Sequence, residues 1–230
     1  MASNKHTLSF SSLKQFDKSP SHFLQYKRRE FKSTAAMRLG TLTHLSILEP
    51  DEYKKNVVVT DLSRRTKAFK EFEAENESKE IITTKEAEQI QGMTDSVAGM
   101  VKARKLIHNA DEKEKSHTWK YRDHVFRGIP DAVSGNCIID LKTTSDIDKF
   151  QWSASKYNYD SQAYIYSKLF GYEFLFIVID KNTHQIGMFD CSPQFYERGE
   201  DKVRKASEAY DLFYKTKDFD PKQYFISKTL

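Results

Sequence analysis

The sequence predicts an α+β fold, arranged as an α/β sandwich. Helical patterns fill roughly the first 110 of the 230 residues, three strand patterns follow, and a helix with two more strands comes next. This order of elements is typical of a sheet covered by helices. The chain is 38% hydrophobic and holds 16 Phe and 12 Tyr, which is enough apolar mass for a substantial core.

The chain reads as one domain, residues 1–230. No internal repeat or low-complexity linker interrupts it, and only eight glycines and five prolines punctuate it. Within this domain we expect a helical N-terminal part at about 1–110, a β-sheet core at about 115–192, and a C-terminal helix and tail at 193–230.

Helices are predicted first. Serines before an apolar pattern favour a helix start near residue 9, and Pro20 should break or restart that helix. An apolar segment with little charge should be buried or line a site. Thr84 opens another helix with acidic residues in its first turn. The expected helices are residues 9–28, 34–48, 67–75 (within a polar connection at 51–82) and 84–108.

The second half is rich in strand patterns, bounded by turn residues. We expect a three-stranded meander, then a helix, two strands and a charged amphipathic helix. Their ranges are 118–122, 125–132 and 137–143 for the meander, 160–169 for the helix, 173–180 and 185–190 for the strands, and 193–215 for the last helix.

The most informative segment is residues 128–144, Gly-Ile-Pro-Asp-Ala-Val-Ser-Gly-Asn-Cys-Ile-Ile-Asp-Leu-Lys-Thr-Thr. Because strand side chains alternate between faces, Asp140 and Lys142 project from one face and Ile139 and Leu141 from the other. The turn at 134–136 folds the chain back and brings Asp131 opposite the second strand. Cβ atoms of opposed residues lie only ~4.5–5.5 Å apart.

An Asp-x-Lys on a strand is usually a surface ion pair. Here residues 137–139 are apolar on both faces, which indicates a buried strand, and buried charges are costly unless they are paired or bound to metal. Two close carboxylates repel each other unless a cation lies between them, and oxygen ligands suit Mg²⁺ or Mn²⁺. A nearby lysine can activate water or stabilise phosphate charge. The segment therefore predicts a phosphodiester-cleaving site.

Other candidate residues keep two interpretations. His44 lies on the apolar helix and is either a core histidine or a metal ligand, and Gly40 lies one turn earlier on the same face. Glu49 is either an extra acidic ligand or the end of the helix before Pro50. One helix places a polar pair on a single face, for packing or for the site: Gln162 and Tyr166.

Composition narrows the functional class only slightly. A net charge of +4 is compatible with a nucleic-acid partner and does not establish one. Arg64, Arg65 and Lys67 form either a solvated face or a phosphate-binding group. Two cysteines cannot alone build a zinc or iron–sulfur site and do not suggest a disulfide framework. With no apolar signal core and no membrane span, we expect a cytoplasmic protein, in a bacterium or a phage-infected host, without a membrane partner.

These elements together resemble the PD-(D/E)xK nuclease superfamily, in its RecE-like exodeoxyribonuclease (exonuclease VIII) branch of phages and prophages. The opening helix from Ser9 and the Leu-Gly-Thr-Leu-Thr-His…Leu-Glu-Pro stretch at 39–50 look like that family's first motifs. Asp131 and Asp140-x-Lys142 look like its catalytic core. The stretch Gln-Ala-Tyr-Ile-Tyr at 162–166 looks like the Gln-x-x-x-Tyr element of RecB-type nucleases.

The resemblance implies a central mixed sheet flanked by helices and an Mg²⁺-dependent, ATP-independent exonuclease, with Mn²⁺ as a possible substitute. It implies that His44, Asp131, Asp140 and the Leu141 carbonyl hold the metal, with Glu49 as a weak candidate. Lys142 would position or deprotonate the attacking water, and Gln162 and Tyr166 would orient the site or contact the DNA backbone. It further implies digestion of linear duplex ends from 5′ to 3′. The remaining 3′ strands would pass to a strand-annealing protein for recombination, and the enzyme would form a homo-oligomeric ring, a trimer or tetramer.

Related nucleases with an iron–sulfur cluster place a cysteine in the opening element and three near the C-terminus. This chain has Ser19-Pro20 and no such cysteine cluster, so no iron–sulfur cluster is expected, and it also lacks a Walker A loop. Two alternatives remain. One is a structure-specific or single-strand endonuclease with the same core, and the other is a non-catalytic DNA-binding scaffold.

Overall fold

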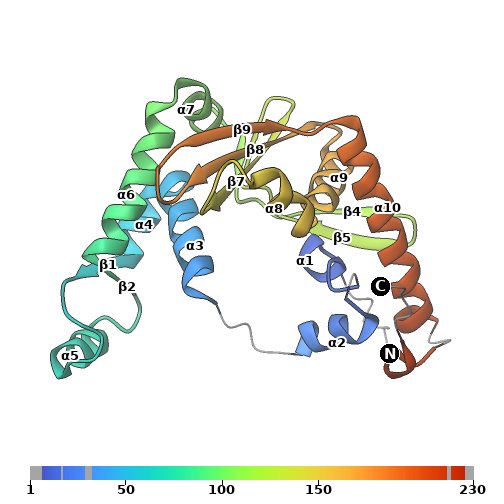
Figure 1. Ribbon diagram of the computed structural model, residues 1–230, viewed down its shortest axis with the longest axis horizontal. Helices are drawn as coiled ribbons and strands as arrows, with labels where there is room; N and C mark the ends of the chain where they lie inside the picture. The colour runs from blue at the N-terminus through green and yellow to red at the C-terminus, as the bar shows by residue number, and fades with distance from the viewer. Residues whose placement is uncertain (1–6, 17, 29–32, 217–218, 226–230) are drawn as a thin grey trace.

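The computed structural model describes residues 7–16, 18–28, 33–216 and 219–225, whose ribbon has the shape of an arch (Figure 1). A five-stranded sheet lies across the top of the arch, with strand order β3-β6-β7-β8-β9. Its strands are β3 (Glu112–Lys113), β6 (Ala132–Ser134), β7 (Cys137–Thr144), β8 (Glu173–Asp180) and β9 (Ile186–Asp190).

This sheet is mixed. β7 runs parallel to β8 over its whole length, from Cys137 opposite Glu173 to Thr144 opposite Asp180, and the other pairs are antiparallel. Helices connect and flank the strands, so the α+β class and the mixed sheet predicted from the sequence are confirmed.

Helices cover both faces of the sheet (Figure 1). The longer ones are α2 (Pro20–Arg28), α3 (Ala35–Leu48), α5 (Lys67–Glu75), α6 (Thr84–Gly99), α7 (Val101–His108), α9 (Tyr159–Phe170) and α10 (Pro193–Tyr210). Short helices are α1 (Phe10–Leu13), α4 (Pro50–Asn56), α8 (Phe150–Lys156), the π-helical turn η1 (Asp211–Lys215) and the 3₁₀ turn η2 (Pro221–Gln223). None of the helices in the described part of the chain is both long and apolar enough to cross a membrane.

Strand alternation places two of the core's hydrophobic clusters on opposite sides of the five-stranded sheet. Ile138, Phe174 and Phe176 pack on one side of the sheet with side chains from α8, α9 and α10. Ile139 and Leu141 pack on the other side with α6 and α7. These side chains are almost fully buried, and each stabilises the fold by about 1.5–3 kcal/mol. By the same alternation, residues 139 and 141 lie on the opposite face of β7 from residues 140 and 142, as predicted.

The predicted three-stranded meander is wrong in its pairing. The expected strand at 125–132 is two strands, β5 (His124–Gly128) and β6, and β5 forms a separate hairpin with β4 (His117–Tyr121). Pro130 lies between them, and since proline has no backbone N–H it cannot continue a ladder. The break leaves Asp131 in the connection between the two sheets.

The predicted helix at 84–108 is also two helices. α6 ends at Gly99, Met100 takes an extended backbone with φ −81° and ψ 105°, and α7 begins at Val101. Glycine is a poor helix former, which favours the break at this point. Pro20 begins α2, as expected. The polar connection at 51–82 contains the expected α5, together with α4 and a parallel pair, β1 (Val57–Thr60) and β2 (Glu80–Thr83), that the sequence pattern did not indicate.

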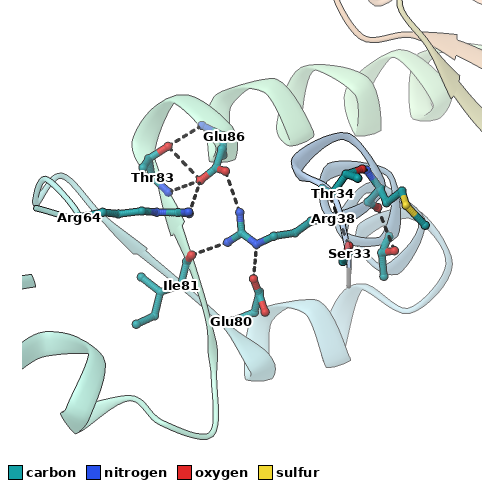
Figure 2. Close-up of polar contacts among 10 residues, drawn as sticks. Ser33, Thr34, Arg38, Arg64, Glu80, Ile81, Thr83 and Glu86 are labelled. Carbon is teal, nitrogen blue, oxygen red and sulfur yellow. Dashed lines mark hydrogen bonds and ion pairs between the residues drawn. The ribbon is translucent and has the colours of Figure 1, made fainter. Parts of the chain in front are cut away.

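An arginine on α3 fastens that helix to β2 and α6 (Figure 2). The Arg38 guanidinium pairs with Glu80, donates to Glu86 at 2.7 Å, and donates to the Ile81 carbonyl at 2.5 Å. Glu86 also closes a capping box with Thr83 at the start of α6. α3 carries His44, so this network helps to position one of the candidate site residues.

Candidate functional site

Three elements bring together the residues predicted for the site. His44 comes from the last two turns of α3, Asp131 from the connection before β6, and Asp140 with Lys142 from β7. The His44 Nδ1 and Asp131 Oδ2 atoms lie 3.5 Å apart, and the imidazole is hydrogen-bonded to the backbone of Leu141. The sequence prediction thus places His44, Asp131, Asp140, Lys142 and the Leu141 backbone in one neighbourhood, and the structure does the same.

Asp131 is held by the strand opposite it. Its Oδ2 accepts a hydrogen bond of 2.6 Å from the Leu141 N–H, and its side chain is buried. β6 begins only at Ala132, so this carboxylate takes the place that a backbone carbonyl would have in a longer ladder. The contact fixes the carboxylate against the middle of β7.

Asp140 is held between two donors. Its Oδ1 accepts a hydrogen bond of 2.6 Å from Gln162 Nε2, and its Oδ2 pairs with the Lys142 ammonium. Within the described part of the chain, the buried Gln162 Oε1 has no hydrogen-bond partner. Since buried polar atoms are normally satisfied, this oxygen marks a position open to a donor such as a bound water.

Burial and mutual charge set the protonation of these groups. Burial, and then the Lys142 charge, lower the pKa of His44 to about 4, so its imidazole is neutral at physiological pH and can act as a ligand. Burial, reinforced by the charge of Asp131, raises the pKa of Asp140 to about 6. Burial also raises the pKa of Asp131. Burial alone would lower the pKa of Lys142. The negative charges of Asp140 and Asp131 have the larger effect and raise that pKa, so the lysine stays protonated.

Glu114 is a candidate ligand that the sequence did not predict. One ligand atom each from Glu114, His44 and Asp131 lie within 4.8 Å of one another. Its backbone has φ 48°, an uncommon left-handed conformation for a non-glycine residue, and its N–H donates to the Asp131 carbonyl at 3.2 Å. Burial, and then the charge of Asp131, raise the pKa of Glu114 to about 7.

No local signal distinguishes Glu114 in the sequence. It lies in the charged run Asp-Glu-Lys-Glu-Lys at 111–115, which is typical of a solvated loop. Only the pairing of β3 with β6 brings this run beside Asp131.

The donor set fits a hard divalent cation. Two carboxylates, a neutral imidazole and the nearby Leu141 backbone match the ligands that Mg²⁺ or Mn²⁺ accepts. Ligands around one ion at ~2.1 Å lie up to about 4 Å apart, so a small inward movement of the three side chains would complete a site. Burial is the main cause of the raised pKa values of Glu114 and Asp140, and the charge of Asp131 adds to it. A cation bound beside these carboxyl groups would favour their ionised forms.

Two aromatic residues support the site. The Lys142 ammonium lies 5.0 Å from the centre of the Tyr159 ring, which confines the lysine opposite Asp140. The Tyr166 hydroxyl bonds the backbone of Ile129, two residues before Asp131. The interpretation that Gln162 and Tyr166 orient the site therefore has a geometric basis, Gln162 through Asp140 and Tyr166 through the Asp131 connection.

Four weaker candidates lie away from this group. Glu49 is exposed and joins α3 to α4, near enough to influence Glu114 by its charge but outside the cluster of ligand atoms. Arg64 contacts Glu86 at 3.4 Å, beside the Arg38 network (Figure 2). Arg65 is exposed, and Lys67 pairs with Glu71 at 3.3 Å on α5, at the outer end of one leg of the arch (Figure 1).

Comparison with known proteins gives a family and a related fold. The family model described as "PDDEXK-like domain of unknown function (DUF3799)" matches residues 9–223. The crystal structure of a "putative exonuclease" from Eubacterium rectale shares the fold with a TM-score of 0.67 at 14% identity, covering 99% of this chain and 91% of that chain. A phage related exonuclease from Haemophilus somnus 129PT gives a TM-score of 0.38 at 14% identity, over 93% of this chain and 97% of that one. No curated protein matches the chain.

Proposed function

The chain belongs to the family of PDDEXK-like domains (DUF3799), and on that premise we propose that it is a divalent-metal-dependent nuclease that digests linear double-stranded DNA from its ends. The observation that carries the proposal is the convergence of the buried Asp131 and Asp140 with the partly exposed His44 and Lys142 in one cluster. An acidic cluster with a neutral imidazole suits a metal, and an ammonium beside it suits phosphate chemistry.

The ligands in this proposal are His44, Glu114 and Asp131, with Asp140 and the Leu141 carbonyl beside them. A bound Mg²⁺ or Mn²⁺ would polarise the scissile phosphate and stabilise the leaving oxygen. Gln162 keeps one oxygen of Asp140 turned toward α9, which fixes the direction of the other. Hydrogen bonds from the protein therefore orient Asp131 and Asp140 without a bound ligand.

Lys142 holds the attacking water in this proposal. Its ammonium lies between Asp140 and the Tyr159 ring, so the side chain is confined and its charge is retained. A protonated lysine can orient a water molecule and offset the negative charge that grows on the phosphate. Because the lysine is protonated, it cannot accept a proton from the water, and its proposed role is to position that water.

The finer parts of the proposal extend the resemblance. We propose ATP-independent digestion from 5′ to 3′ in the cytoplasm, leaving 3′ single strands for an annealing protein. We further propose a homo-oligomeric ring, a trimer or tetramer, as the form that stays on DNA during many cycles.

The test is a gel assay with linear duplex DNA labelled on one strand, with Mg²⁺ and without ATP, next to closed circular DNA. The proteins compared are the wild type, Asp140→Asn and, as a matched control, Asp95→Asn, which alters an exposed carboxylate on α6. We expect progressive loss of the 5′-ended strand with the wild type and the Asp95 variant, and none with the Asp140 variant.

Other outcomes separate the alternatives. Cleavage of closed circles would indicate an endonuclease. DNA binding without cleavage of either substrate would indicate a scaffold, and activity of the Asp140 variant equal to wild type would overturn the assigned site.

A further inference from the structure

A groove opens directly beside the site and is shared with it. Its volume is about 540 Å³, and His44 and Lys142 form part of its wall. The other walls come from the first half of α3, the end of β7, α8 and the residue after β8. The lining residues are Ala36, Met37, Gly40, Thr41, Thr143, Thr144, Ser145, Phe150, Ser153, Tyr157, Tyr159 and Lys181.

The chemistry of this wall suits an anion. Its lining among the described residues includes no carboxylate, although the chain as a whole has 33 acidic residues and the neighbouring cluster has several. It does contain two ammonium groups and several hydroxyls, of which those of Thr41 and Thr144 already donate to backbone carbonyls. This arrangement is what a phosphate backbone needs in a binding surface.

Lys181 supplies the charge at the far end of the groove. In the described part of the chain its ammonium is in none of the ion pairs, although Asp180 precedes it directly. The Asp180 carboxylate is buried and accepts hydrogen bonds from the N–H groups of Ile147, Asn182 and Thr183. The positive charge of Lys181 is therefore left for a ligand.

The spacing of the two lysines fits a nucleic-acid strand. Thr144 pairs with Asp180, so Lys181 lies level with Ser145, three residues beyond Lys142 along β7. At ~3.3 Å per strand residue, this separates the two positions by about 10 Å. Phosphates recur every ~3.4 Å of axis along one strand, so a phosphate near Lys181 would lie only a few nucleotides from one at Lys142.

The groove is too small for double-stranded DNA. Cavities of ~300–1,000 Å³ take a small molecule, so 540 Å³ holds one or two nucleotides rather than a duplex. Tyr157 lines the groove and is 48% exposed, so its ring can stack on a base. We propose that this groove binds a short single-stranded stretch next to the scissile phosphate, with Lys181 on a backbone phosphate and Tyr157 against a base. The inference rests on the proposed nuclease function and adds the form of substrate.

The test compares Lys181→Gln with Lys120→Gln, which removes an exposed charge from the β4–β5 hairpin. The first readout is steady-state cleavage of linear duplex DNA at several salt concentrations. We expect Lys181→Gln to raise KM several-fold with kcat retained, and to reduce the slope of log KM against log salt by about 0.7–0.9, the value for one lost phosphate contact. Tyr157→Ala should raise KM about tenfold without changing that slope.

The second readout is anisotropy of a labelled eight-nucleotide single strand with Ca²⁺ in place of Mg²⁺. Weaker binding by Lys181→Gln than by Lys120→Gln supports the groove, even if no variant cleaves DNA and the nuclease proposal fails. If the wild type cleaves DNA and the two lysine variants match it in KM, salt slope and anisotropy, the groove proposal is overturned and the nuclease proposal stands.

Discussion

The Tyr166 hydroxyl binds both polar backbone groups of Ile129, accepting from its N–H and donating to its carbonyl at 3.0 Å each. The Tyr166 ring lies against Gly128, where an added Cβ would come within 3.1 Å of it. One side chain of α9 therefore fixes the connection that ends at Asp131.

Tyr166→Phe removes both hydrogen bonds and keeps the ring. Because two backbone groups lose their partner, the free energy of unfolding should fall by about 1–3 kcal/mol, as measured by urea denaturation. Cleavage should fall as well, since Asp131 loses its support. Tyr157→Phe is the matched control because its hydroxyl belongs to a half-exposed ring, and it should leave unfolding within about 0.5 kcal/mol of wild type. Equal unfolding curves for wild type and Tyr166→Phe would contradict the assigned support.

Glu114→Gln should weaken metal binding, because it replaces one of three converging ligand groups with a neutral amide. Titration calorimetry with Mn²⁺ should show at least a tenfold higher Kd, equivalent to about 1.4 kcal/mol. Glu49→Gln is a close control, since that carboxylate is exposed nearby but outside the cluster. A larger loss with the Glu49 variant than with Glu114→Gln would reverse the assignment.

The pH dependence of the metal-free protein gives an independent view of Glu114. Its pKa is raised from 4.5 to about 7 in the fold, so the folded protein holds a proton that the unfolded chain releases. Its contribution to stability is therefore present below pH 4.5 and is lost as the pH rises to about 7. His44, with its pKa lowered to about 4, contributes in the opposite direction between pH 4 and 6.5.

Subtracting a variant isolates the Glu114 contribution. With EDTA present, the Tm of the wild type should fall relative to that of Glu114→Gln as the pH rises from 4.5 to 7. Saturating Mg²⁺ should restore the wild type most strongly above pH 7, where the carboxylate is free of its proton. A difference in Tm that is flat across this range would show that Glu114 titrates normally.

The sequence predicted that several of these candidate residues lie together, because their chemistry is concentrated on one strand. Asp140 and Lys142 follow from period-two alternation, and Ile138 and Ile139 identify the strand as buried. The family resemblance added His44 and Gln162. Glu114 could not be predicted, since its role depends on a two-residue strand pairing and a left-handed backbone inside a charged run.

The errors in the fold have local causes. Pro130 divides one apparent strand between two sheets, and Gly99 with Met100 divides one apparent helix. The parallel pair of β1 and β2 is four residues long on each side, too short for a clear pattern in a polar segment. Strand pairing depends on contacts between distant segments, which a single sequence does not display.

Arg38→Ala tests whether the network of Figure 2 supports the site at a distance. It removes contacts to Glu80, Glu86 and the Ile81 carbonyl, so unfolding should cost about 1–3 kcal/mol less. Arg38→Lys keeps the charge and loses the planar guanidinium, so its free energy of unfolding should lie between those of the wild type and Arg38→Ala. Arg65→Ala, an exposed control, should stay within about 0.5 kcal/mol of wild type. Mn²⁺ affinity should follow the same order, because His44 lies on the same helix; an unchanged affinity in Arg38→Ala would show that the network is only structural.

Lys142→Met separates positioning chemistry from metal binding. The methionine keeps most of the side-chain length, and Asp140 loses its charged partner, so its pKa should rise further and its proton should take the place of the ion pair. Cleavage should fall by about 10²–10⁴-fold if the lysine holds the attacking water. Mn²⁺ binding should persist above pH 8, where the carboxylates are ionised. Because a broken buried pair destabilises a fold, circular dichroism and Tm at the assay temperature must first show that the variant is folded. A folded, metal-binding Lys142→Met with near wild-type cleavage would remove the lysine from the mechanism, while the carboxylate site could still stand.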